Sequence, residues 1–177
     1  MIIQLAIFLF ISFTVVNEQA EYPVPPKTNK MLFYIQRNHN KNTIIYDANY
    51  DKEGNLVRDN PVNVYWIRYE ENGQKMKLRA LEKWMVFGVS TKFLKNNNEY
   101  LVHLSASDKI SLWLKQREPF KAEIHTEVKG EMIKLDHIYA QLSESGWLPK
   151  PIYAEFFGTK LSDGKAFYKK VDPKYIK

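Results

Sequence analysis

The sequence predicts a mainly β protein, folded as a single antiparallel β-barrel or strongly bent β-sandwich with one short inserted helix; a calycin-like barrel is one form of this class. Runs of β-branched and aromatic residues recur from residue 31 onward, and turn-forming residues separate them at intervals of about eight to twelve positions. Residues 122–128 also alternate strictly between apolar and polar side chains, as in a strand with one buried face. The turn spacing predicts roughly eight or nine strands.

The first 20 residues predict export. Residues 2–16 form an almost unbroken apolar run, and the polar stretch Asn17-Glu18-Gln19-Ala20 follows it, which is the layout of a signal peptide. The run is shorter than the roughly 20 residues that span a bilayer, so we expect a signal peptide at residues 1–20 that is cleaved near Ala20. The alternative is an uncleaved anchor, which would be the only membrane contact. The expected location is the periplasm or cell envelope of a bacterium, or the outside of the cell.

Charge and cysteine content exclude several classes of protein. The chain has 26 basic and 20 acidic residues, but the lysines are scattered and form no compact run, so we expect no nucleic-acid partner. Cysteine is absent, which excludes thiolate zinc sites and disulfides and leaves stability to the core. The four histidines stand far apart in the sequence, and none has metal-ligand spacing from another. We therefore expect neither a metal nor a cofactor.

The rest of the chain divides into an extended lead-in and one domain. Residues 21–30 contain three prolines, which remove backbone donors and exclude regular helix or central strand. Residues 31–177 are expected to form a single β-rich domain. Lys129-Gly130 is the sharpest hairpin signal, because it joins two alternating segments. The expected strands are residues 32–36, 43–50, 62–69, 100–106, 110–115, 122–128, 132–142, 152–157 and 166–171.

One segment breaks the strand pattern and predicts a helix. In residues 78–87 the side chains of Leu78, Leu81 and Met85 share one helical face, and Gly88 is placed to end the helix. We expect this helix to lie against the sheet or to plug one end of a barrel.

Strand parity makes two further predictions. Apolar positions in residues 132–142 change parity, which indicates a bulge or bend near Asp136-His137. In residues 122–128 the side chain of His125 falls on the polar face, so we expect an exposed histidine.

The strand expected at residues 62–69 carries an arginine on an apolar face. Two valines and Trp66 share parity with Arg68. If that face is buried, the guanidinium needs a carboxylate or an anionic ligand group. Asp47 or Glu82 could supply the carboxylate, the side chain could reach solvent at the strand end, or a ligand could supply the anion.

Candidate ligand-binding residues gather around the polar connection at residues 37–42. Such connections lie at the mouth of a β-barrel, where barrels bind ligands, although residues of this type also form tight structural turns. None of the common catalytic motifs occurs and no carboxylate pair stands out, so the sequence nominates no catalytic residue. The candidate ligand-binding residues are Arg37, Asn38, His39, Asn40, Asp47, Trp66, Arg68 and Glu82.

Several linked motifs resemble one family. They are Leu32-Phe33-Tyr34-Ile35-Gln36-Arg37, the ladder of Asn38, Asn40 and Asn42, Ile45-Tyr46-Asp47-Ala48-Asn49, Pro61-Val62-Asn63-Val64-Tyr65-Trp66-Ile67-Arg68-Tyr69, and the turn at Gly73. Across about residues 22–142 the chain resembles the uncharacterised bacterial family known as domain of unknown function 4833, and Glu82 and Gly88 match its acidic-helix-then-glycine pattern. That family has no assigned activity. The resemblance therefore implies one exported or envelope-associated domain and no mechanism.

Three functions compete. The 11 tyrosines, 10 phenylalanines and 4 tryptophans favour a non-enzymatic module that binds a small apolar or amphipathic ligand in an aromatic-lined cavity, although a solid core would also use them. The first alternative is an envelope hydrolase with a rim cluster of Arg37, His39, Asp47 and Arg68. The second is an envelope protein-interaction module that uses an exposed strand edge.

Overall fold

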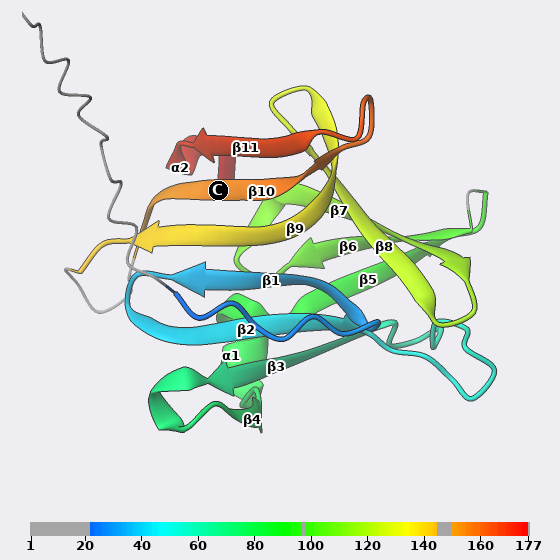
Figure 1. Ribbon diagram of the computed structural model, residues 1–177, viewed down its shortest axis with the longest axis horizontal. Helices are drawn as coiled ribbons and strands as arrows, with labels where there is room; N and C mark the ends of the chain where they lie inside the picture. The colour runs from blue at the N-terminus through cyan, green and yellow to red at the C-terminus, as the bar shows by residue number, and fades with distance from the viewer. Residues whose placement is uncertain (1–21, 97, 145–149, 177) are drawn as a thin grey trace, which may run out of the picture.

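Eleven strands form one curled sheet, which confirms the mainly β class (Figure 1). The computed structural model describes residues 22–176 apart from residues 97 and 145–149, so the expected signal peptide lies outside the described residues. The strands are β1 (Met31–Arg37), β2 (Asn40–Ala48), β3 (Val62–Arg68), β4 (Gln74–Lys77), β5 (Val89–Leu94), β6 (Glu99–Leu104), β7 (Ser107–Glu118), β8 (Lys121–Val128), β9 (Glu131–Leu142), β10 (Pro151–Lys160) and β11 (Ala166–Val171).

The turn spacing missed two of these strands, β4 and β5. In β4, three of the four residues are Lys or Gln, and in β5 apolar residues flank the polar stretch Ser-Thr-Lys. Neither segment shows the apolar run or strict alternation that marks a strand in sequence. The two strands lie at opposite ends of the strand path β4-β3-β2-β1-β9-β8-β7-β6-β5. Each of them is held in the sheet by hydrogen bonds to one neighbouring strand.

The long strand β9 joins two layers. Its beginning pairs with β8, its end pairs in parallel with β1, and β10 follows it along the opposite edge. The first layer therefore contains β1–β4 and β9–β11, and the second contains β5–β8 (Figure 1). The β9–β10 register shifts opposite Leu135 and His137, which confirms the irregularity predicted near Asp136-His137. The hairpin at Lys129-Gly130 is also confirmed, and both of its residues have positive φ.

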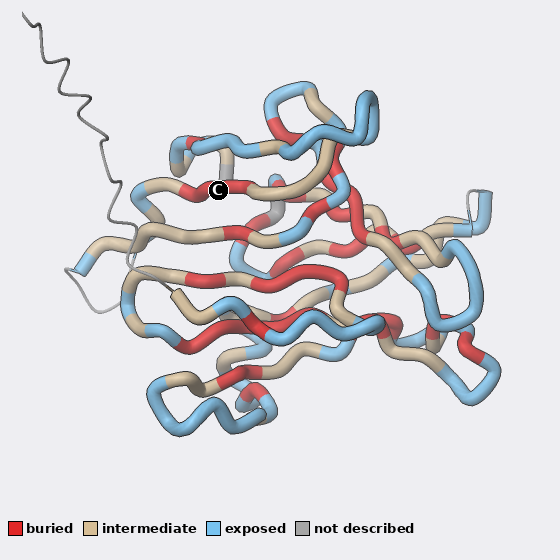
Figure 2. Tube along the Cα trace, in the orientation of Figure 1, coloured by how far each residue is buried: buried red, intermediate tan, exposed pale blue. Residues whose placement is uncertain are grey.

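The core lies between the two layers (Figure 2). Phe33 of β1 and Tyr46 of β2 stack with ring centroids 4.2 Å apart, and both side chains are almost fully buried. Leu112 of β7 and Ile133 of β9 belong to the same cluster, as does Phe156 of β10. Full burial of each such side chain stabilises the fold by about 1.5–3 kcal/mol.

A helical segment lies against the inside of the sheet, as the sequence predicts. It consists of α1 (Ala80–Glu82) and a π-helical turn, η2 (Lys83–Phe87). The Tyr46 hydroxyl donates to the Phe87 carbonyl at 3.0 Å, and Gly88 N–H closes the turn on the Lys83 carbonyl at 2.9 Å. A Cβ at Gly88 would lie 2.0 Å from that carbonyl oxygen, so the end of this turn requires glycine.

The helical face predicted for this segment is partly wrong. Leu78 is buried, but Leu81 is 63% exposed and Met85 is only partly buried. Phe87 packs against the core in their place. The π-helical turn changes the angular step between residues, so a pattern counted at 3.6 residues per turn selects the wrong side chains.

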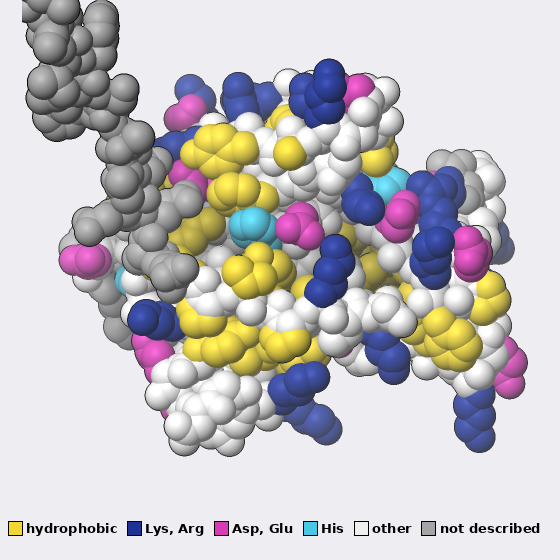
Figure 3. All heavy atoms as spheres, viewed as in Figure 1, with side chains coloured by type: hydrophobic (Ala, Val, Ile, Leu, Met, Phe, Trp, Pro, Cys, Tyr) yellow, Lys and Arg dark blue, Asp and Glu magenta, His cyan; other side chains and the backbone are white. Residues whose placement is uncertain are grey.

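The outer face of the first layer carries a row of side chains that stack across strands. Tyr34 of β1 stacks on His137 of β9 at 4.8 Å, His137 stacks on Phe157 of β10 at 4.1 Å, and Phe157 contacts Tyr168 of β11 at 5.1 Å. Figure 3 views this face, where hydrophobic side chains gather over the strands of the first layer. Stacking of this kind fixes the lateral order of the strands.

The lead-in is extended, as predicted, and lies along the same outer face. The Gln36 side-chain amide donates to the Pro23 carbonyl at 3.0 Å, and the Tyr22 ring lies 5.3 Å from the ring of Tyr139. Pro25 is buried. These contacts make the lead-in part of the folded domain.

Candidate functional site

Two arginines meet on the core side of the first layer. Arg37 is the last residue of β1, and Arg68 is the last residue of β3. Their guanidinium carbons lie 4.8 Å and 5.3 Å from the centroid of the same indole ring, that of Trp66. Trp66 is buried, so both cations face inward at the end of their strands. We refer to Arg37, Arg68, Trp66, Phe87 and Glu82 as the arginine cluster.

The Trp66 ring organises this cluster. Phe87 of η2 packs edge-on against it with centroids 5.0 Å apart, and the Arg37 guanidinium also lies 5.0 Å from the Phe87 ring. The indole N–H donates to a Glu82 carboxylate oxygen at 3.3 Å. One indole thus contacts two cations, one aromatic ring and one carboxylate. Cation–π attraction accounts for the placement of both guanidinium groups.

A network of turn contacts holds the two arginines near each other. The Asn42 side-chain oxygen accepts from Glu70 N–H at 3.1 Å, and the Glu70 carboxylate accepts from Lys41 N–H at 3.1 Å. These bonds join the start of β2, just after the β1–β2 turn, to the 3₁₀ helix η1 (Tyr69–Glu71), which follows β3. The ends of β1 and β3 are consequently fixed with respect to each other.

Arg37 carries a partly buried charge that forms no ion pair with any residue the structure describes. Among the described residues no carboxylate forms an ion pair with it, and its Nε is buried without a hydrogen-bond partner. Burial lowers the pKa of Arg37, and the nearby Arg68 lowers it further, while Glu82 and Glu70 oppose this shift. A guanidinium keeps its charge even so, and a buried unpaired charge is costly.

Arg68 has a partner, but it is neither of the two that the sequence suggested. The Arg68 guanidinium lies 3.2 Å from the Glu71 carboxylate, whose side chain is 49% exposed. Glu82 is occupied by the indole of Trp66 and by Arg79 N–H, which donates to it at 2.8 Å. The Nε of Arg68 is buried and unpartnered, as is that of Arg37.

Asp47 points away from the arginine cluster. Its register partner in β3 is Asn63, and its carboxylate accepts from the Tyr65 hydroxyl at 3.0 Å. Tyr65 packs with the small cluster on the outer face of the first layer. Burial raises the pKa of Asp47, against the lowering effects of the Tyr65 bond and nearby lysines. Pairing of Asp47 with Arg68, one of the alternatives that the sequence left open, is therefore not what the structure shows.

The remaining candidate residues shape the β1–β2 turn. The Asn38 side-chain amide donates to the Leu142 carbonyl at 3.0 Å, and its oxygen accepts from Leu142 N–H at 2.8 Å. The Asn40 side chain accepts from Asn42 N–H at 3.2 Å, and His39 is exposed. Of the eight candidates, the structure brings together four: Arg37, Trp66, Arg68 and Glu82. Sequence reasoning missed Phe87 and Glu71; the only signal for Phe87 is an aromatic residue directly before Gly88.

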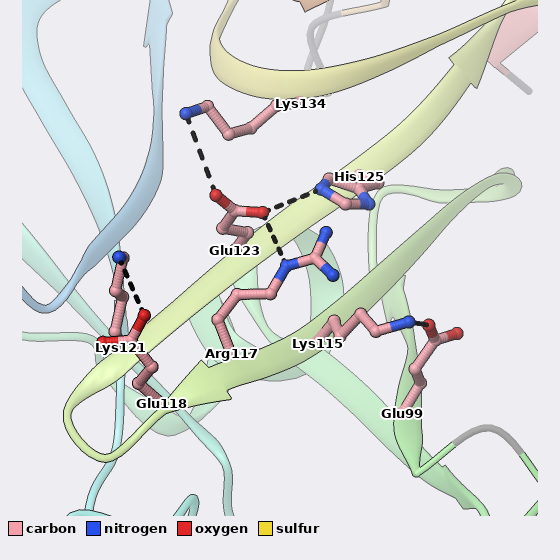
Figure 4. A network of polar contacts seen from close by, with 8 residues as sticks. All are labelled: Glu99, Lys115, Arg117, Glu118, Lys121, Glu123, His125 and Lys134. Atoms are coloured by element: carbon pink, nitrogen blue, oxygen red, sulfur yellow. Dashed lines mark hydrogen bonds and ion pairs between the residues drawn. The ribbon is translucent and has the colours of Figure 1, made fainter. Parts of the chain in front are cut away.

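A second polar cluster lies on the outer face of the second layer (Figure 4). Glu123 contacts Arg117 at 3.0 Å, His125 at 3.4 Å and Lys134 at 4.0 Å. Burial tends to raise the pKa of Glu123, but the Arg117 bond, the nearby cations and the His125 bond lower it overall. Every charge here has a protein partner, so this cluster is explained by folding alone.

His125 of this cluster is buried, not exposed. Its residue is 7% exposed, and burial lowers the pKa of its imidazole. Across the strands it pairs with Trp113 on one side and Lys134 on the other. These long side chains cover it, which alternation within its own strand could not reveal.

Comparison with known families supports the resemblance read from the sequence motifs. The family described as "Domain of unknown function (DUF4833)" matches residues 33–170, which include β2–β10 and most of β1 and β11. The chain belongs to this family. Domain of unknown function 4833 thus includes the whole arginine cluster in this protein. No curated protein and no solved structure matches the chain.

In the part of the chain that the structure describes, no helix is long and apolar enough to cross a membrane. Within the same residues, no group of three or more His, Cys, Asp or Glu side chains could hold a metal ion. The arginine cluster is the strongest candidate site among the described residues, because its Arg37 guanidinium lies over Trp66 without an ion pair.

Proposed function

We propose that the protein is an exported, non-enzymatic binding module that holds a small amphipathic ligand by an anionic group. One observation carries this proposal: the Arg37 guanidinium faces Trp66 and Phe87 without an ion pair among the described residues. A bound carboxylate or phosphate would supply the missing negative charge. The two aromatic rings would contact the apolar part of the ligand.

Arginine suits this role because its donors form a planar fork. A guanidinium binds both oxygens of a carboxylate or phosphate, and such charge-assisted bonds contribute about 1.5–3 kcal/mol each. Arg68 lies over the same indole ring as Arg37, and its side chain is 21% exposed, so solvent reaches the proposed site there. Its partner Glu71 is held by a surface ion pair, which costs little to break.

The two alternative functions receive less support. A hydrolase built on Arg37, His39, Asp47 and Arg68 would need these groups to converge, but Asp47 bonds Tyr65 on the outer face. An interaction module would need an accessible strand edge. The edge strands β4 and β11 each carry two lysines and the edge strand β5 carries one, and lysines on an edge discourage pairing with another strand.

Calorimetric titration of the mature protein tests the proposal. The probes are hexanoate and hexyl phosphate, with hexanol as an uncharged ligand of the same chain length. We expect both anions to bind at least about tenfold more tightly than hexanol, which corresponds to one charge-assisted bond. Arg37→Met should remove this preference, because methionine keeps the apolar stem and loses the charge.

Arg58→Met is the matched control. The Arg58 guanidinium also lies over an aromatic ring, that of Phe93 at 5.3 Å, but outside the arginine cluster. This variant should bind hexanoate as the wild type does. Equal binding of hexanoate and hexanol, or equal losses in the two variants, would refute an anion site at Arg37.

A further inference from the structure

The outer face of β7 and β8 carries an open hollow beside the C-terminal helix α2 (Pro173–Ile176). Its volume is about 340 Å³, and its walls are Lys109, Ser111, Trp113, Glu127, Lys174 and Tyr175. Hollows of this size accommodate small organic ligands. None of its residues belongs to the arginine cluster.

Strand parity and α2 together build this hollow. Leu112 and Leu114 are fully buried, so Trp113 between them turns outward. The Tyr175 hydroxyl accepts from Lys129 N–H at 2.7 Å, and the Lys129 ammonium lies 4.4 Å from the Tyr175 ring centroid. The aromatic wall supplied by α2 is therefore fixed to the turn between β8 and β9.

Three polar groups in the walls have no partner in the part of the chain that the structure describes. Among the described residues, the Ser111 hydroxyl, the Trp113 indole N–H and the Glu127 carboxylate form no hydrogen bond or ion pair. They offer one donor, one acceptor and one group that does both. The Lys109 ammonium donates one of its three hydrogens to the Lys174 carbonyl at 3.0 Å.

We propose that this hollow binds a sugar ring. Sugar hydroxyls both donate and accept, so one ring can pair with Ser111 and Glu127 while it stacks on Trp113, whose indole N–H stays free for a further hydroxyl of a longer glycan. The C–H face of the ring is apolar and matches the flat indole of Trp113. An open hollow also leaves room for the substituents of a longer glycan.

Other ligand classes fit these walls less well. A purely apolar ligand would strip water from the three polar groups without replacing its hydrogen bonds. A small anion could contact Lys109, but it would also meet the carboxylate of Glu127, and Lys174 already lies 4.0 Å from the carboxylate of Asp172. A free amino acid is the closest competitor, since its ammonium could pair with Glu127.

Ligand-observed NMR on the mature protein tests this site at millimolar ligand. The probes are glucose, galactose, mannose, N-acetylglucosamine, cellobiose and chitobiose, with glycine and lysine as amino-acid probes. We expect at least one sugar to show saturation transfer from the protein. Trp113→Ala and Glu127→Ala should each weaken that sugar about tenfold or more.

Two control variants make the result specific. Trp84→Ala removes a tryptophan that is 78% exposed elsewhere, and it should bind the sugar as the wild type does. Arg37→Met should also keep sugar binding, which separates this site from the arginine cluster. Glu127 is exposed, so Glu127→Ala should fold even if Trp113→Ala does not. The proposal is overturned if no sugar binds, if only an amino acid binds, or if a folded Glu127→Ala protein binds the sugar unchanged.

Discussion

Replacing Arg37 by methionine should leave the free energy of unfolding nearly unchanged, although the residue is partly buried. Burial of a guanidinium costs several kcal/mol, and no ion pair among the described residues offsets that cost. Cation–π contacts with Trp66 and Phe87 return about 0.5–2 kcal/mol each. Methionine removes both effects and keeps the apolar contacts of the stem. The expected change is therefore about 1 kcal/mol or less, in either direction.

Urea unfolding followed by tryptophan fluorescence measures this difference, with Arg58→Met as the control. The slope of the unfolding free energy against urea should be the same in all three proteins. A loss of about 3 kcal/mol or more in the free energy of unfolding of Arg37→Met, with no such loss in Arg58→Met, would refute the reasoning. A loss of that size is typical of a broken buried ion pair, and it would assign Arg37 to folding instead of binding.

Three further predictions concern the fold and its processing. Gly158→Ala should lower the free energy of unfolding by about 1–3 kcal/mol, because its Cβ would lie 2.3 Å from the Lys134 carbonyl oxygen. Thermal melts check this, with Thr159→Ala as the control. Burial lowers the pKa of His125 from its ordinary value of 6.5, so the unfolded chain binds a proton more readily than the folded protein. The free energy of unfolding should therefore fall as the pH drops below 6.5. His125→Gln should make the melting temperature less dependent on pH in this range. Mass spectrometry of the envelope fraction should find a form of the protein that starts near Glu21, whereas a full-length soluble form in the cytoplasm would contradict export.

The sequence predicted the parts of the fold that depend on local patterning. Lys129-Gly130 gave the β8–β9 hairpin, and the parity change in residues 132–142 gave the bend near Asp136-His137. The parallel pairing of β1 with β9 was out of reach, because Tyr34 and His137 are about 100 positions apart and no local signal connects them. The π-helical turn was also missed, since its period differs from that of an α-helix.

The candidate site was likewise predictable where it depends on neighbouring residues of one strand, and not where it depends on the order of the strands. Trp66 and Arg68 share a strand face in sequence and in the structure, so parity alone was enough to associate them. Parity could not show whether Asp47 faces the core or the outside of the sheet. Ile45 shares a strand face with Asp47 and Tyr46 lies on the opposite face, yet both are fully buried. The approach of Arg37 to Trp66 depends on the order of β1, β2 and β3, which composition and spacing do not determine.

A crystal structure of the mature protein with hexanoate tests the central claim most directly. The account predicts a carboxylate about 2.7–2.9 Å from guanidinium nitrogens of Arg37, with the alkyl chain against Trp66 or Phe87. Arg68 should contact the same carboxylate or lie beside it. A structure with hexanoate elsewhere, or with Arg37 paired to a carboxylate of the protein itself, would contradict the claim.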